Sequence, residues 1–209
     1  MARRGWRLVL AASVALGLVS VASNIATTAE LSGDADNLLA VRSTVSKFLN
    51  SGAVWGGLPV LCGWLVRRRV PAAAAGMAAC LLALVVHYGV GRLLGQFDPT
   101  VWTDNQFWIV LAVVVGGPLG LAGATARRVD RWGLLARLVV PVGAVLEPFI
   151  VGMFTMPAVM PWPGRVSSIV SGVVLLLAGT AGGVEVLVTH RRRQPGSSTH
   201  KRDAARAPR

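Results

Sequence analysis

Six long apolar stretches, separated by short polar segments, dominate the chain. Most approach the ~20 residues that a helix needs to cross a bilayer, although the second is short. The pattern therefore predicts an all-α, polytopic membrane bundle of six transmembrane helices within one domain, residues 1–193. The predicted spans cover residues 7–26, 50–66, 71–94, 106–126, 134–156 and 167–189. Residues 194–209 are polar and basic, which predicts a disordered cytoplasmic tail.

Residues 31–50, between the first two apolar stretches, are polar but patterned. Their apolar members recur at helical spacing on one face, namely Leu38, Val41, Val45, Phe48 and Leu49. The spacing is compatible with an amphipathic helix lying on the outer membrane surface, and equally with an ordinary loop. The first stretch also has two interpretations. A retained span is favoured over a cleavable signal peptide ending near Val21-Ala22-Ser23, because its apolar run is long for such a peptide.

The charge distribution orients the predicted spans. Only 14% of residues are charged, against about 25% in a soluble domain, and the net charge is +12. The arginines gather at the N-terminus, at residues 67–69 and 127–131, and after residue 190. These places alternate with the spans as the positive-inside rule requires for two cytoplasmic termini. We therefore expect a bacterial plasma membrane protein whose partner is the lipid bilayer, and no nucleic acid.

The tryptophans also follow the predicted span ends. Trp6, Trp64 and Trp132 fall near cytoplasmic ends, and Trp55, Trp102, Trp108 and Trp162 near outer ends. This placement predicts an aromatic belt at each membrane interface.

Small residues recur at every fourth position of the fourth span, at Ala112, Gly116, Gly120 and Ala124. Such spacing lets helix backbones approach closely, and we interpret it as packing within the bundle rather than as a dimer contact. Cys62 and Cys80 both fall inside apolar stretches without a C-x-x-C spacing, which predicts free, buried thiols.

Three polar side chains within the predicted spans are candidate ligand-binding residues: Glu147, His87 and Arg92. Charged and titratable groups are costly in a bilayer, so each needs a partner or a role. His87 and Glu147 are expected at similar depth in the outer half of the membrane, where Glu147 would pair with His87 or with Arg92. The alternatives left open are a polar site for a cation, a proton or a small ligand, and a clasp between helices.

The chain lacks the motifs of several kinds of site. It has no G-x-S-x-G nucleophile motif, no H-E-x-x-H zinc motif, no P-loop and no dinucleotide fingerprint. We therefore predict no catalytic residues, no metal and no cofactor, and a protein that is not an enzyme.

Three short strings carry a family resemblance. They are Asn50-Ser51-Gly52-Ala53-Val54-Trp55, Gly116-Gly117-Pro118-Leu119-Gly120-Leu121-Ala122-Gly123 and Gly143-Ala144-Val145-Leu146-Glu147. In this order they resemble a family of small integral membrane proteins of high-GC Gram-positive bacteria, known as a domain of unknown function. The resemblance covers residues 38–188 and implies the architecture but no activity. It implies an aromatic residue where His87 stands, which makes Glu147 the stronger candidate of the two.

Two functions are compatible with these observations. The first is a non-enzymatic membrane protein that packs with a membrane-protein partner or with copies of itself. The second is a small-solute transporter, or the substrate-binding subunit of one, with Glu147 in an outward-facing polar site. Six spans and cytoplasmic termini resemble the binding components of energy-coupling-factor vitamin transporters.

Overall fold

A computed structural model describes residues 2–157 and 159–193, and the predicted tail at 194–209 lies outside them. The described residues form helices and no strands. In chain order the helices are α1 (Ala2–Asn24), α2 (Thr28–Ser32), α3 (Asp36–Leu49), α4 (Gly52–Val66), α5 (Arg69–Leu93), α6 (Val101–Asp104), α7 (Gln106–Thr125), α8 (Arg131–Ile150) and α9 (Trp162–Arg192).

Several helix starts are fixed by side chains that cap free backbone N–H groups. Thr27 and Glu30 form a reciprocal capping box at α2. The Ser51 hydroxyl accepts from the N–H of Val54 at the start of α4, and Asp130 accepts from the N–H of Gly133 at the start of α8.

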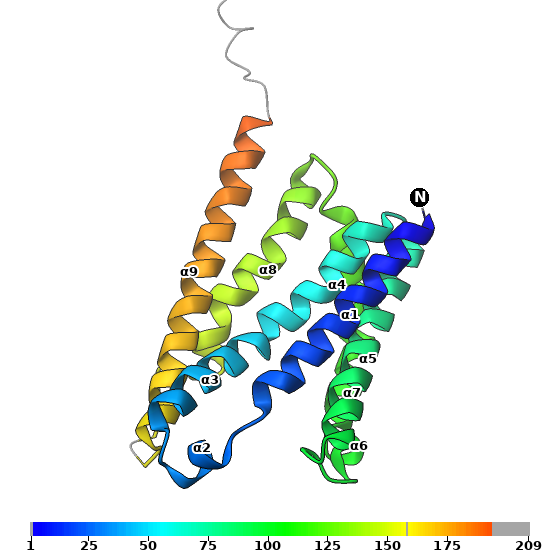
Figure 1. Cartoon of the computed structure of the whole chain (residues 1–209). Coiled ribbons are helices and arrows are strands. Elements are labelled where there is room, and N and C mark those ends of the chain that lie inside the picture. Colours follow the sequence, from blue (N-terminus) through cyan, green and yellow to red (C-terminus); the bar gives the residue numbers. More distant parts are fainter. Residues whose placement is uncertain (1, 158, 194–209) are drawn as a thin grey trace, which may run out of the picture.

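The long helices run alternately up and down the bundle, and the described residues contain six helical segments long and apolar enough to cross a membrane. Figure 1 shows the N-terminus and the end of α9 at the same end of the bundle. The arginines of residues 67–69, 127–131 and 191–193 belong to this end, which we call the basic end. The short helices α2 and α6 lie at the opposite end. The predicted six-span, all-α architecture is confirmed.

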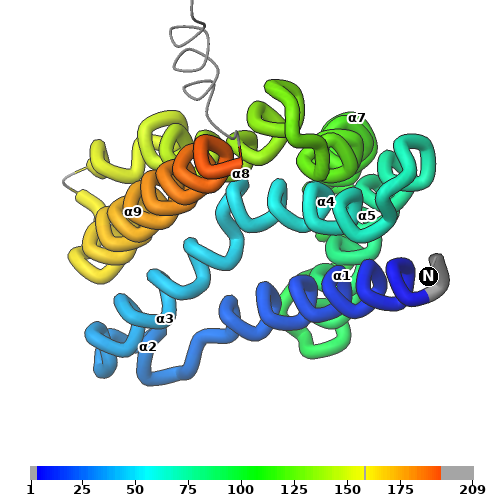
Figure 2. Tube along the Cα trace, turned by 90° about the horizontal axis from the view of Figure 1, so that it is seen from above, coloured from blue at the N-terminus to red at the C-terminus, as the bar shows by residue number. Residues whose placement is uncertain are grey.

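The second span differs from the expectation. Residues 36–49 form the helix α3, which is the helical one of the two alternatives expected for this segment. It packs against α1 and α9 and leads into α4, so that Asp36–Val66 forms one 31-residue candidate span with a break at Asn50 and Ser51. From above, α4 lies at the centre of the bundle, surrounded by α1, α5, α7 and α8 (Figure 2).

The helix contacts around α7 depend on glycine. A Cβ at Gly120 would lie 2.2 Å from the Ala72 carbonyl oxygen of α5, and one at Gly123 would lie 1.9 Å from the Val60 carbonyl oxygen of α4. Only hydrogen fits at these places, so α7 packs backbone to backbone on both neighbours. Gly116 and Gly120 of the predicted ladder thus serve packing within the bundle. Cys62 and Cys80 are free and buried, as predicted.

The pair α8 and α9 diverges from the rest of the bundle. Figures 1 and 2 both show α8 tilting away from α7 as it descends from the basic end. Helix α3 joins the pair to the bundle, because the Lys47 ammonium donates to the Gly164 carbonyl at 2.9 Å and to the hydroxyls of Ser167 and Ser168 at 2.8 and 2.6 Å. Lys47 therefore fixes α3 on α9 through three neutral acceptors.

Candidate ligand site at the break in the second span

The break between α3 and α4 leaves backbone N–H groups without helical partners, and Glu147 satisfies two of them. Its Oε1 accepts from the N–H of Gly52 at 2.6 Å, and its Oε2 accepts from the N–H of Ala53 at 2.8 Å. The carboxylate thus sits where the α4 dipole is positive. Glu147 comes from α8, next to the buried Pro148, so this contact also ties α8 to the centre of the bundle.

On the other side of the break, Asn50 joins a second polar group. The Ser20 hydroxyl of α1 donates to Asn50 Oδ1, and Ser20 Oγ lies 2.8 Å from Nδ1 of the buried His87. Ser20 has a single hydroxyl proton, which it donates to Asn50. The hydroxyl oxygen of Ser20 therefore accepts from His87 Nδ1–H. Neutral His87 then presents Nε2 as an acceptor, and this atom has no hydrogen bond among the described residues.

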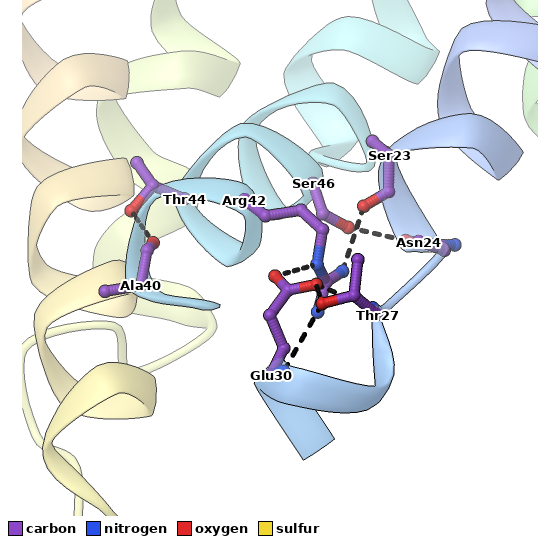
Figure 3. A network of polar contacts seen from close by, with 8 residues as sticks. All are labelled: Ser23, Asn24, Thr27, Glu30, Ala40, Arg42, Thr44 and Ser46. Atoms are coloured by element: carbon purple, nitrogen blue, oxygen red, sulfur yellow. Dashed lines mark hydrogen bonds and ion pairs between the residues drawn. The ribbon is translucent and has the colours of Figure 1, made fainter. Parts of the chain in front are cut away.

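A ladder of polar contacts continues from Asn50 along the interface of α1 and α3, and Figure 3 shows its part from Ser46 and Asn24 to Glu30. Asn50 Nδ2 lies 3.4 Å from Asn24 Oδ1, and Ser46 donates to the same Asn24 oxygen. One turn further, Arg42 donates to the Ser23 carbonyl at 3.1 Å and to Glu30 at 2.7 Å. The ladder therefore reaches from the end that carries α2 to His87.

Glu30 anchors the end of this ladder that lies at α2. It is buried, its Oε2 accepts from the N–H of Thr27 at 2.7 Å, and its Oε1 pairs with Arg42. The hydrogen bond from the Thr27 N–H, with those from Arg42 and the Thr27 hydroxyl, lowers the pKa of Glu30 below its ordinary value of 4.5, although burial opposes this.

A cavity of about 330 Å³ lies against the break, between α4, α5 and α7. Its polar lining includes Asn50, His87 and Tyr88, and most of the remaining wall is apolar, with Trp55 and Trp108 as its largest side chains. Trp55 packs edge-on to His87, with ring centroids 6.1 Å apart. This volume and composition are those of a site for a small, largely apolar molecule with few polar groups.

A second hollow of about 360 Å³ adjoins the first, between α4 and α8. The two share Gly52, Gly56 and Leu119 as lining residues, and Glu147 lines the second. The first turn of α4 thus separates the hollow that holds Glu147 from the cavity that holds His87.

The structure brings the predicted site residues together only in part. Glu147 and His87 approach the same helix break from opposite sides, and neither pairs with the other. Arg92 is exposed near the end of α5, beside Asp98 in the following loop, and takes no part in the site. Its charge helps to lower the pKa of Asp98, for which the hydrogen bonds from Thr100 are the larger cause. Trp55 and Trp108, both expected in an aromatic belt, line the cavity.

Sequence reasoning did not identify Ser20, Asn50, Arg42 or Lys47 as site or anchoring residues. A signal was available. Arg42, Ser46 and Asn50 recur at intervals of four, as do Ser20 and Asn24, and i,i+4 spacing places each set on one helix face. Among the described residues, no three His, Cys, Asp or Glu side chains are grouped as a metal site would require.

The fold and site define a class: an all-helical, polytopic bundle with six candidate membrane spans among the described residues, the second broken next to a cavity. Residues 40–190 match a family described as a family of unknown function (DUF6518). The match spans more than half of the chain, so the chain belongs to this family. Comparison with curated proteins and with solved structures gave no match.

Proposed function

We propose that this protein binds a small, largely apolar molecule that carries a hydrogen-bond donor, and that it acts as a transporter or as the substrate-binding subunit of one. The observation that carries the proposal is the break in the second span, which faces a cavity lined by both His87 and Asn50. Transporters commonly build their sites from discontinuous helices. Here Glu147 and the Ser51 hydroxyl accept from the N–H groups at the break, and the break brings the side chain of Asn50 to the cavity.

The chemistry of the cavity supports a binding role rather than catalysis. Asn50 and Nδ1 of His87 are held by fixed partners, and Nε2 of His87 remains as an acceptor for a donor group of the ligand. Cys80 also lines the cavity, but no hydrogen bond joins its thiol to His87 among the described residues, and the Ser20 hydroxyl that contacts His87 Nδ1 gives its proton to Asn50. Neither group is therefore arranged as a nucleophile activated by His87. Glu147 holds the helix break in place and is a positioning residue in this proposal.

We further propose that the protein lies in the plasma membrane of a bacterium with both termini in the cytoplasm. The basic end carries the arginine runs, and the positive-inside rule supports placing it in the cytoplasm. The polar ladder from Glu30 to His87 then begins on the outer side. A periplasmic reporter fused after residue 98 is expected to be active, and one fused after residue 129 inactive. The reverse result would overturn the orientation.

The binding proposal is tested by filling the cavity. Gly56 lines the cavity, and a Cβ there meets only Leu119 Cδ1, at 3.6 Å, so Gly56→Leu places a side chain in the cavity without a backbone clash. Gly89→Leu is the matched control, because a Cβ at Gly89 meets nothing within 4 Å.

Native mass spectrometry of the protein, extracted in mild detergent from its native membrane, is the measurement. We expect a bound small molecule with the unmodified protein and with Gly89→Leu, and its loss with Gly56→Leu. Absence of any bound molecule from all three proteins, or its retention by Gly56→Leu, would overturn the proposal and favour a role in packing with a partner protein.

A further inference from the structure

A different cavity, of about 400 Å³, lies at the basic end and has no part in the proposed function. It lies between the ends of α4, α7 and α9 and the start of α8, where the α8–α9 pair stands apart from the other helices (Figure 1). Its charged lining comes from separate segments, with Arg127 after α7, Arg137 on α8, Glu185 on α9 and Arg193 directly after α9.

Two of the guanidinium groups are held in place by neutral groups. Arg137 donates from Nε to the Gly133 carbonyl at 3.0 Å and from Nη2 to the Arg128 carbonyl at 2.6 Å. Arg127 donates to the Trp64 carbonyl at 3.1 Å, and its Cζ lies 4.6 Å from the centroid of the Trp64 ring. These contacts orient the positive charges without neutralising them, and further N–H groups of each fork remain available.

The charge of this cavity is unbalanced. Three arginines and one glutamate give a formal net charge of +2, since 3 − 1 = 2. In the part of the chain that the structure describes, the ion pairs are Arg42 with Glu30 and Arg128 with Asp130, and neither lies in this cavity. Glu185 is in the lining but forms no ion pair with its arginines among these residues.

We propose that this cavity binds the phosphate group of an anionic phospholipid. Planar guanidinium forks match the oxygens of a phosphate, and basic pockets between membrane helices are suited to lipid head groups. The position supports a lipid as the source, because the cavity lies at the level where the spans end and the Trp64 ring offers an apolar wall beside the charge. The bound phosphate would join the α8–α9 pair to the ends of α4 and α7.

The test uses opposite charge changes in the full-length protein. Phosphatidylglycerol is titrated against the delipidated protein in mild detergent, with phosphatidylcholine of the same acyl chains as the comparison, and binding is read by native mass spectrometry. We expect phosphatidylglycerol to bind selectively. Arg137→Gln should weaken it about tenfold or more, since a hydrogen bond to a charged group is lost.

Glu185→Gln is the second variant, and it should bind phosphatidylglycerol more tightly because a repelling carboxylate is removed. Glu185→Gln retains every arginine, so it tests the proposed lipid binding even if Arg137→Gln fails to fold. Arg92→Gln removes an exposed arginine near the opposite end and should have no effect. Equal binding of both lipids, or an equal loss with Arg92→Gln, would overturn the proposal.

Inorganic phosphate and glycerol 3-phosphate separate the two sources of a phosphate group. Weak or absent competition by either is expected for a lipid site. If either displaces phosphatidylglycerol at equal concentration, the site belongs to a free phosphate compound and the lipid assignment is overturned.

Discussion

Replacing Glu147 with glutamine tests whether the break in the second span depends on one carboxylate. Both Glu147 oxygens accept from the first N–H groups of α4, at 2.6 and 2.8 Å. Glutamine offers a single acceptor oxygen, and its NH₂ group would face an N–H group. One backbone donor at the break therefore loses its partner, and the charge that favours the α4 N-terminus is lost as well.

The magnitude follows from these two losses. A hydrogen bond to a charged group contributes about 1.5–3 kcal/mol. A carboxylate at a helix N-terminus adds about 0.3–1 kcal/mol. Together they predict that Glu147→Gln lowers the free energy of unfolding by about 2–4 kcal/mol, and that Glu147→Ala, which removes both hydrogen bonds, lowers it further.

The free energy is measured by unfolding the purified protein in mixed micelles with increasing denaturing detergent, without added lipid. Glu185→Gln is the matched control, because it removes an exposed carboxylate for which the described residues provide no hydrogen bond. We expect it to change the free energy by less than about 0.5 kcal/mol. A loss for Glu147→Gln no larger than that of the control would refute the capping role.

Other perturbations test the packing, the loop at α2 and the position of α3. Gly120→Ala should lower the free energy of unfolding by about 1–3 kcal/mol, since its Cβ would overlap a carbonyl of α5. Gly143→Ala is the control and should be neutral or slightly stabilising, because a Cβ at Gly143 meets nothing within 4 Å. Equal effects of the two substitutions would contradict this packing. The pKa of Glu30 is lower in the folded than in the unfolded protein, so its contribution is present above 4.5 and is lost as the pH falls through the folded pKa. Glu30→Gln should therefore reduce the loss of thermal stability on acidification, and an unchanged pH profile would contradict this. A cysteine replacing the buried Ala40 should react slowly with a water-soluble maleimide, and faster once Lys47→Met removes the contact with α9; rapid labelling with Lys47 in place would favour a surface position for α3.

The six-span architecture could be predicted from the sequence because it depends on properties that add along the chain. Length, apolar content and arginine placement each follow from local composition. The exception is residues 36–49, whose continuity with the second span was not predicted. The reason is again local. Arg42, Ser46 and Asn50 make this segment polar, and a hydropathy pattern cannot show that Glu30, Asn24 and Ser20 satisfy those side chains across a helix interface.

The candidate site was predicted only in part, because it depends on which helices are neighbours. His87 and Glu147 were singled out as polar groups within apolar stretches, and both lie next to the break in the second span. Their direct pairing would require α5 and α8 to touch, but α4 packs against both of them and lies between. Equal depth in the membrane is necessary for such a pair and does not establish that the two helices are adjacent.

The break itself argues for a binding site rather than a simple clasp. A continuous helix from Asp36 to Val66 would satisfy its own N–H groups and pack without a carboxylate in the interior. The broken helix leaves donors that lipid cannot satisfy, and it requires Glu147 and the Ser51 hydroxyl to compensate. As a result of the break, the side chain of Asn50 and the backbone of Gly52 and Gly56 form part of the cavity wall. Holding two helices together does not require this arrangement, and it is therefore the observation that supports the proposed binding site.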